Sequence, residues 1–190
     1  MNSTIASSRE REQRFREMYD ASYIDLLRFV RRRVHPTHAE DVVGEVMLVA
    51  WRRLDDVPAD LVGSRAWLFG VARNILQNTR RREDRHDAVA VRLADGLHRP
   101  ADAGELPDLV AHRADIAAAW PRLSALHQEA IALSVLDGLT APEAAVVLGI
   151  SSTAFRLRLS RARRTLRRHV ESTTADVRLS GGLASDRSPR

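Results

Sequence analysis

Apolar residues recur at helical spacing along most of the chain, and no segment shows the apolar–polar alternation of a β-strand. Three amphipathic helices are predicted in the first half. The first helix spans about 9–33 and ends before Pro36. Its apolar positions recur at helical spacing, namely Phe15, Met18, Tyr19, Leu26, Leu27 and Val30. The second spans about 38–54, begins at a predicted capping box of Thr37 and Glu40, and has the apolar stripe Ala39, Val43, Val46, Ala50 and Leu54.

The third predicted helix follows a loop at 57–63 that contains Pro and Gly, and Ser64 is expected to cap it. Its apolar residues Trp67, Leu68, Val71 and Ile75 share one side, and Phe69 and Leu76 form a smaller patch on the other. An arginine cluster at 80–82 ends the helix. Three helices with apolar faces predict a small bundle, whereas the helical pattern fades from about residue 83 to 108, which indicates a linker.

Helical patterning resumes near Leu109 and gives a stripe of Leu126, Ala130 and Leu133 within 124–137. Residues 139–168 then predict two short helices joined by a tight turn. Thr140 and Glu143 match a capping box, Gly149 supplies a left-handed residue, and Ser151 is placed to cap the second helix. Glycine in such a turn is typical of helix-turn-helix motifs, whose second helix enters the major groove of DNA.

The second helix of this motif has an apolar arc and a basic remainder. The arc contains Phe155, Leu159, Ala162, Leu166 and Val170. Six arginines fall outside it: Arg156, Arg161, Arg163, Arg164, Arg167 and Arg168. A solvated helix face normally mixes charges of both signs, yet Glu143 is the only acidic residue from 139 to 170. This imbalance favours a polyanion as the partner of this helix.

Composition sets the class of protein. All 30 basic residues are arginine, and the chain has 25 acidic residues. Arginine suits contacts with phosphates and guanine edges, but the exclusive use of arginine would also follow from a GC-rich genome. The chain has no cysteine, and no apolar run is long enough for a membrane span, so a cytoplasmic protein without disulfides is expected. The pattern divides the 190 residues into a disordered start (1–8), a bundle (9–85), a linker (86–108), a helix-turn-helix domain (109–170) and a disordered tail (171–190).

The motifs of several enzyme classes are missing. The sequence has no P-loop, no glycine-rich dinucleotide turn and no nucleophile elbow, and His35 and His38, which flank Pro36, are the nearest approach to a metal-binding pair. We therefore expect no catalytic activity, no cofactor and no metal.

Residues 39–57 with 64–76, and then 122–168, resemble regions 2 and 4 of the extracytoplasmic-function (group 4) sigma factors of bacterial RNA polymerase. The resemblance implies two small all-α domains joined by a flexible linker. It also implies a polymerase subunit whose region 2 docks on the clamp coiled coil and opens the minus-ten element, while region 4 reads the minus-thirty-five element. The implied partners are core polymerase, through its clamp coiled coil and flap, promoter DNA, and, as a further option, an anti-sigma factor, with no membrane.

The resemblance assigns three groups of residues. Minus-thirty-five recognition is assigned to Ser151, Ser152, Thr153, Arg156, Leu157, Ser160, Arg161 and Arg164, with Leu157 where the family commonly has a small polar residue. Minus-ten recognition is assigned to Arg65, Trp67, Arg73, Asn74, Asn78, Arg80, Arg81 and Arg82, although Trp67 also fits a core position. Polymerase docking is assigned to a second face of the helix at 38–54, namely Asp41, Gly44, Glu45, Leu48 and Arg52.

Two alternatives stay open at this level. A helix-turn-helix activator that is not a polymerase subunit would use the same motif, although such proteins usually add a ligand-binding or phospho-acceptor domain. The acidic linker, with Asp87, Asp95, Asp102, Glu105 and Asp108, resembles a family thread that mimics RNA in the polymerase channels, but it also fits a solvated spacer.

Overall fold

The computed structural model describes the backbone of residues 2–82 and 107–184 and the side chains of residues 8–79 and 108–173. Every regular element in these ranges is helical, which confirms the all-α fold class. The helices are α1 (Asn2–Arg31), α2 (Ala39–Arg52), α3 (Leu61–Arg82), α4 (Pro107–Ala119), α5 (Ala125–Ile131), α6 (Ala141–Leu148) and α7 (Ser152–Ala184). Short helical turns η1 (Pro36–His38), η2 (Leu54–Asp56) and η3 (Trp120–Arg122) and the π-helical segment η4 (Ala132–Leu136) connect them.

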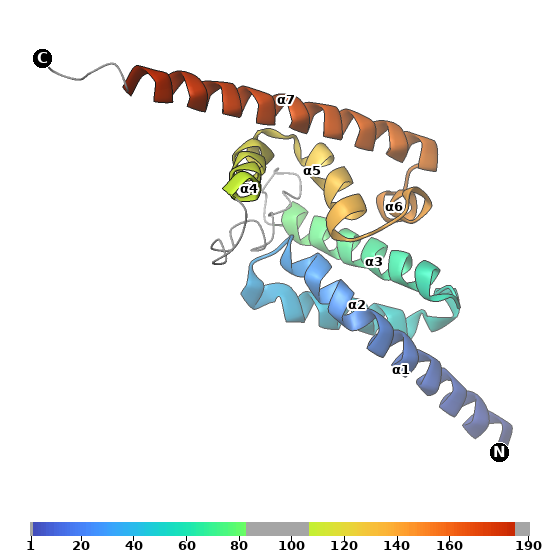
Figure 1. Cartoon of the computed structure of the whole chain (residues 1–190). Coiled ribbons are helices and arrows are strands. Elements are labelled where there is room, and N and C mark those ends of the chain that lie inside the picture. The colour runs from blue at the N-terminus through green and yellow to red at the C-terminus, as the bar shows by residue number, and fades with distance from the viewer. Residues whose placement is uncertain (1, 83–106, 185–190) are drawn as a thin grey trace, which may run out of the picture.

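The first three helices pack against one another as the predicted bundle (Figure 1). The predicted stripe of α2 is buried at every position from Ala39 to Leu54, with at most 2% of any of these residues exposed. Phe29 of α1 stacks on Phe69 of α3, with 4.4 Å between the ring centroids. The smaller apolar patch that the sequence placed on α3 is therefore part of the core.

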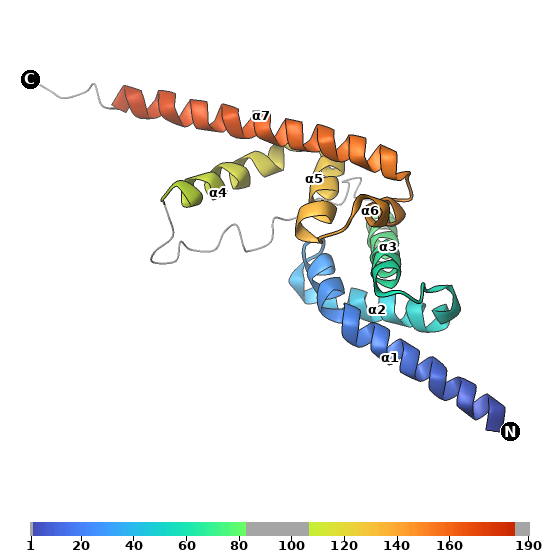
Figure 2. The ribbon, with the colours of Figure 1, turned by 45° about the vertical axis from the view of Figure 1, so that its right-hand side comes forward.

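In the second half, α7 lies across α4, α5 and α6 (Figure 2). Its arc packs against them as predicted, because Phe155 and Ala162 are buried and Leu159 and Leu166 are half-buried. The stripe predicted for 124–137 is only partly correct. Ala130 and Leu133 are fully buried, but Leu126 is 53% exposed because it lies in the first turn of α5, beyond the packed part of that helix.

The first half of the chain (2–82) and the second half (107–184) pack against each other. A single hydrophobic cluster contains Leu68 and Phe69 of α3 together with Ala144, Val147 and Leu148 of α6. Both views place α3 between the α1–α2 pair and the α5–α6 pair (Figures 1 and 2). The predicted linker residues 86–106 lie outside the described residues.

Both ends for which the sequence predicted disorder have a helical backbone over most of their length. Helix α1 begins at Asn2, and α7 continues from the expected stop near Val170 to Ala184. No Pro or Gly interrupts either extension up to Gly181, so a helix that starts in the core can propagate outward. The Ser172 and Thr173 hydroxyls, which had indicated disorder, donate hydrogen bonds to the His169 carbonyl of the preceding turn, at 2.9 Å each.

Two predicted helix caps in the first half are wrong. Helix α3 begins at Leu61 and not at Ser64, because Asp60 is the residue that caps it: the Gly63 N–H donates to Asp60 Oδ1 at 2.7 Å. Ser64 is instead buried inside the helix. No capping box forms at α2, since the Thr37 hydroxyl pairs with His35 Nδ1 at 2.8 Å within η1.

Candidate nucleic-acid interface

The turn between α6 and α7 is built from the residues that the sequence indicated. The Glu143 carboxylate accepts from the Thr140 N–H at 2.7 Å, and the Thr140 side chain accepts from the Glu143 N–H, which completes the capping box at the start of α6. Gly149 ends α6 with φ of 64°, a conformation that other residues rarely adopt. Ser151 Oγ then accepts from the Ala154 N–H at 3.1 Å. These local bonds fix the direction in which α7 leaves the turn.

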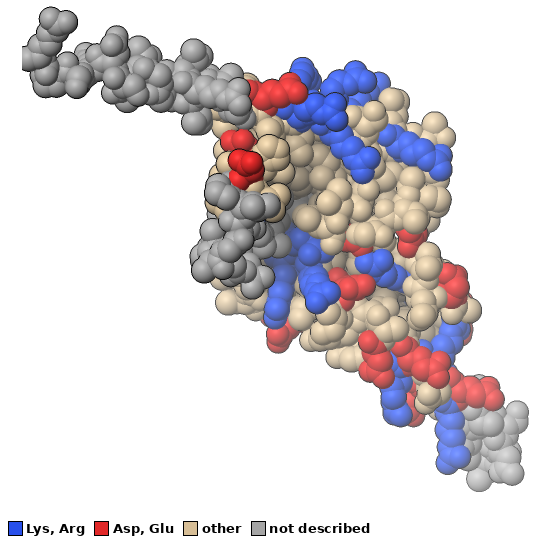
Figure 3. Space-filling view, in the orientation of Figure 1, with Lys and Arg blue, Asp and Glu red and all other residues tan. Residues whose placement is uncertain are grey.

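The face of α7 opposite its apolar arc is open to solvent. Of the eight residues assigned to minus-thirty-five recognition, Ser152 is half-buried and the others are exposed: Ser151, Thr153, Arg156, Leu157, Ser160, Arg161 and Arg164. Arginine side chains gather over this part of α7 in the space-filling view (Figure 3). The structure thus brings the predicted recognition residues onto one accessible helix face.

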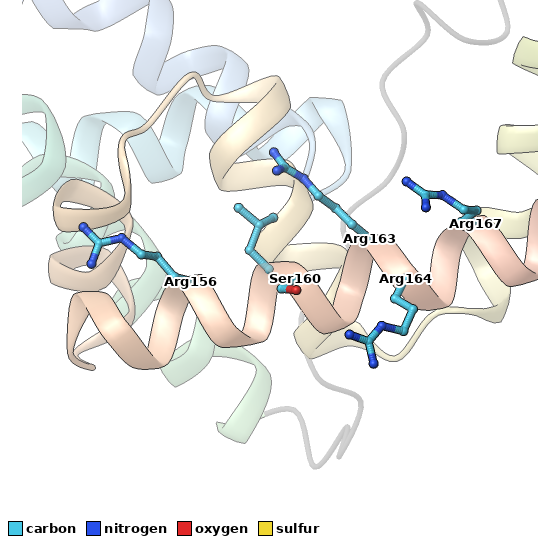
Figure 4. Close-up of a pocket in the computed structure, with 6 residues that line it drawn as sticks. Arg156, Ser160, Arg163, Arg164 and Arg167 are labelled. Carbon is cyan, nitrogen blue, oxygen red and sulfur yellow. The ribbon is translucent and has the colours of Figure 1, made fainter.

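The arginines on this face are not neutralised within the described part of the chain. No Asp or Glu side chain of those residues forms an ion pair with Arg156, Arg161 or Arg164. A depression of about 450 Å³ is lined by Arg156, Leu159, Ser160, Arg163, Arg164 and Arg167. Figure 4 shows Arg163 and Arg167 directed to one side of α7 and Arg164 away from them. Such a surface is complementary to a phosphate backbone.

Leu157 has an apolar neighbour that sequence reasoning had placed in the core. Leu157 is 52% exposed and lines a second depression of about 340 Å³ together with Leu126, from the start of α5. The same depression is lined by His127, Arg158 and Arg161. The position of Leu126 two residues after the N-cap Ser124 was the available signal, because side chains of the first helical turn often lie outside the core.

The predicted docking face of α2 is exposed and continuous. Asp41, Gly44, Glu45, Leu48 and Arg52 are all exposed, and Leu48 retains 57% of its surface. A Cβ atom added at Gly44 would meet no atom within 4 Å, so another molecule can approach the backbone there. The structure therefore confirms that these side chains lie off the core, on one side of the helix.

The structure divides the minus-ten candidates between two faces of α3. Asn74 and Asn78 are exposed, and Trp67 is half-buried against the bundle, with the Arg53 guanidinium 5.9 Å from its ring centroid. Arg65 and Arg73 lie on the other face, which packs against the second half. Arg80, Arg81 and Arg82 continue α3, but their side chains lie outside the described residues.

Both arginines on that other face are already paired. Arg73 Nε lies 3.0 Å from the Glu129 carboxylate of α5, and these two side chains are only 16% and 7% exposed. Arg65 pairs with Asp25 at 3.0 Å and donates to the Asp137 carbonyl. In this conformation Arg73 is paired with Glu129 of the second half, and Arg65 is held by Asp25 of α1 and the Asp137 carbonyl. The assignment of Arg65 and Arg73 to minus-ten DNA stays a prediction.

A buried charge cluster next to these pairs had no signal in the sequence. Arg32 and Arg33, in the turn directly after α1, both donate to the Asp137 carboxylate that follows η4, and the Arg33 contact measures 3.0 Å. The side chains of Arg33 and Asp137 are fully buried. Burial lowers the pKa of the Arg33 guanidinium, whereas the charge of Asp137 acts to raise it.

Comparison with known proteins identifies the family. Residues 18–86 match the family described as Sigma-70 region 2, and residues 113–166 match Sigma-70, region 4. The ECF RNA polymerase sigma factor SigL of Mycobacterium tuberculosis is 33% identical over 153 residues, which cover 80% of this chain and 86% of SigL. The chain belongs to the extracytoplasmic-function sigma factors of the sigma-70 family.

Further relatives of this sigma factor agree with that assignment. The RNA polymerase sigma factor NccH of Alcaligenes xylosoxydans xylosoxydans is 30% identical over 144 residues, covering 74% of this chain and 77% of NccH. Among solved structures, CnrH in complex with the cytosolic domain of CnrY aligns with a TM-score of 0.56 and 26% identity, over 83% of this chain and 88% of that one. The described helices of the sigma factor include none that is long and apolar enough to cross a membrane.

Proposed function

We propose that this sigma factor binds core RNA polymerase and directs it to promoters whose minus-thirty-five element is read by α7. The observation that carries the proposal is the exposed arginine face of α7, which has no acidic partner among the described side chains and which the capped α6–α7 turn orients. We further propose that the protein works in the cytoplasm and has no catalytic activity of its own, because polymerase carries out the chemistry.

Recognition by α7 combines two kinds of contact. Arginines such as Arg164 and Arg167 neutralise phosphates, which supplies affinity that depends steeply on salt. Arg156 and Arg161 reach base edges, where an arginine fork matches the O6 and N7 acceptors of guanine. Leu157, next to them, suits a thymine methyl group, which is the apolar feature of the major groove.

The exposed face of α2 is proposed as the polymerase contact. Leu48 supplies apolar area at its centre, Asp41 and Glu45 supply negative charge, and Gly44 allows close approach. We assign this face to the clamp coiled coil and assign contact with the polymerase flap to the second half.

Opening of the minus-ten element is assigned to α3. Asn74 and Asn78 have free access to a separated strand, and their amides can hydrogen-bond with base edges. Arg73 can join them only after its ion pair with Glu129 is broken, and Arg65 only after it releases the Asp137 carbonyl. Flipping a base out of the stack costs a few kcal/mol, which these contacts must offset.

An anti-sigma factor is proposed as an additional partner. The structural neighbour CnrH was solved with the cytosolic domain of CnrY bound. A protein of this kind that covered the α2 face or the α7 face would prevent the contacts described above.

The proposal is tested with the purified full chain and core polymerase. We expect the chain to co-purify with core polymerase in the absence of DNA and to direct run-off transcription from a subset of genomic fragments. Core polymerase alone is the control. Failure to bind core polymerase, together with specific DNA binding by the free chain, would instead support a helix-turn-helix activator.

A further inference from the structure

The two halves of the molecule are joined by ion pairs as well as by apolar packing. Asp137, from the second half, accepts hydrogen bonds from Arg32 and Arg33 of the first half. Arg33 is held in place on its own side, because it also donates to the Phe29 carbonyl at 2.9 Å and its guanidinium lies 3.6 Å from the centroid of the Phe29 ring. Contacts within its own half therefore help to hold Arg33 in the orientation that meets Asp137.

The second ion-pair contact lies on α3 itself. Glu129 of α5 accepts from Arg73, with the Nε to Oε1 distance at 3.0 Å. The Asp137 carbonyl accepts from Arg65. Both arginines belong to the group assigned to minus-ten DNA, so the acceptors Glu129 and Asp137 occupy positions that phosphate or base acceptors would need.

Between the two ion-pair contacts, the backbones of α3 and α6 come close. A Cβ atom added at Gly70 would lie 3.9 Å from the Cα atom of Val147. Helix α6 in turn packs against α7. With helix axes about 8–10 Å apart at each contact, α3 and α7 lie within about 20 Å of each other.

Promoter DNA requires a much larger separation. The minus-ten and minus-thirty-five elements are about 25 base pairs apart, which is about 85 Å at 3.4 Å per base pair. A conformation in which α3 packs on α6 cannot place α3 on one element and α7 on the other. The halves must separate before both elements are read.

We propose that the Asp137 and Glu129 ion pairs form an interdomain latch, which holds the free sigma factor in a closed conformation that hides part of its own minus-ten surface. The latch is defined as Arg32, Arg33 and Arg65 with Asp137, and Arg73 with Glu129. The inference rests on the proposed function, since it assigns regulation to the surface that opens the promoter.

The chemistry of the latch makes the closed state reversible. Buried ion pairs add little net stability compared with apolar packing, because desolvation of the charges offsets their attraction. They are, however, sensitive to the loss of one partner, which leaves a buried charge without its counterion. Phosphates that approached Arg65 and Arg73 would compete directly with Glu129 and Asp137, so DNA favours the open form.

The first test measures opening in the full chain. The protein has no cysteine, so cysteines introduced at the exposed positions Asp20 and Ala111 carry a fluorescent pair without competing sites. We expect Asp137→Asn to reduce the ratio of closed to open molecules by at least about tenfold, and Glu129→Gln to reduce it in the same direction. Asp55→Asn, which removes the 3.2 Å ion pair of Arg11 within the first half, should leave energy transfer unchanged.

Circular dichroism separates opening from unfolding in this test. If Asp137→Asn loses helical content, the energy-transfer comparison is made with Glu129→Gln, whose helical content is checked in the same way. Energy transfer equal to that of the wild type in folded Asp137→Asn and folded Glu129→Gln would overturn the latch.

The second test locks the closed state. Cysteines at Gly70 and Val147 are close enough to form a disulfide between α3 and α6. With core polymerase and a promoter that the wild type uses, we expect the oxidised protein to lose at least tenfold in run-off transcript and the reduced protein to recover it. Equal transcription by both forms would overturn the proposal. If the wild type directs no transcription at all, the proposed function fails, while the energy-transfer comparison still decides whether the latch exists.

Discussion

Leu48→Arg is the sharpest test of the polymerase-binding face, because the structure separates its effect on binding from its effect on folding. Leu48 is 57% exposed on α2 and lies between Glu45 and Arg52, away from the buried stripe. Leucine and arginine have similar helix propensities, so the change should alter the free energy of unfolding by less than about 0.5 kcal/mol.

The expected loss of affinity for polymerase follows from the surface of Leu48 that is exposed to solvent in the free protein. Complete burial of a leucine side chain contributes roughly 1.5–3 kcal/mol. Because 57% of its surface is open, covering that part against polymerase should contribute roughly 1–2 kcal/mol, or about fivefold to thirtyfold in Kd. A guanidinium that cannot be solvated in the complex adds to this loss.

The assay is the affinity of labelled full-length protein for core polymerase, measured beside its thermal unfolding. Ile24→Arg is the matched control, since Ile24 is 54% exposed on α1 and undergoes a similar chemical change outside the proposed face. A Kd for Leu48→Arg within twofold of the wild-type value would remove this face from the interface. Equal losses for Leu48→Arg and Ile24→Arg would show that the effect is not specific to α2.

Three further predictions concern α7. Arg161→Ala should weaken promoter binding several-fold through the loss of a base contact, whereas Arg158→Ala, at a half-buried position beside the arc, should change it little; DNA-binding titrations check both. Arg156→Ala should cost about 1–3 kcal/mol and relax the preference for one guanine, and Leu157→Ser should shift the preference at a neighbouring thymine. Selection of minus-thirty-five variants tests this pair, and identical selected sequences for Leu157→Ser and wild type would show that the leucine reads no base. Phe155→Ala should destabilise the fold by about 3–5 kcal/mol, because Phe155 is only 1% exposed in the shared core, and denaturant unfolding measures it.

The helix-turn-helix was predictable because its determinants are local. Thr140, Glu143 and Gly149 act within a few residues of one another, so their spacing alone defines the capping box and the left-handed turn. The apolar arc of α7 was equally accessible, since helical periodicity decides which side chains share a face. Exposure of Arg156, Leu157 and Arg161 followed directly from that arc.

The latch could not be predicted from one sequence, because its members are far apart along the chain. Arg33 and Asp137 are separated by 104 positions, and nothing near either residue indicates a partner. For the same reason Arg73 was interpreted from its local surroundings as a DNA contact, although in the folded chain it meets Glu129, which is 56 positions away. Local patterns predicted which surfaces each helix has, but not which surfaces the halves bury together.

The helix ends show a third limit. Serine and threonine have low helix propensity, which favoured disorder after Val170, yet Ser172 and Thr173 satisfy their hydroxyls on the preceding turn and α7 continues. Propensity is a weak guide where a helix is already nucleated by a packed segment such as that around Phe155 and Ala162.

The shared core has a consequence for the lifetime of the protein in the cell. Opening the halves uncovers apolar side chains of one cluster, including Leu68 and Phe69 on α3 and Val147 and Leu148 on α6. An opened chain without a partner is therefore a substrate for chaperones, proteases and aggregation. Polymerase that covers this surface would protect the chain, so the amount of active protein would follow the supply of free polymerase as well as the rate of synthesis.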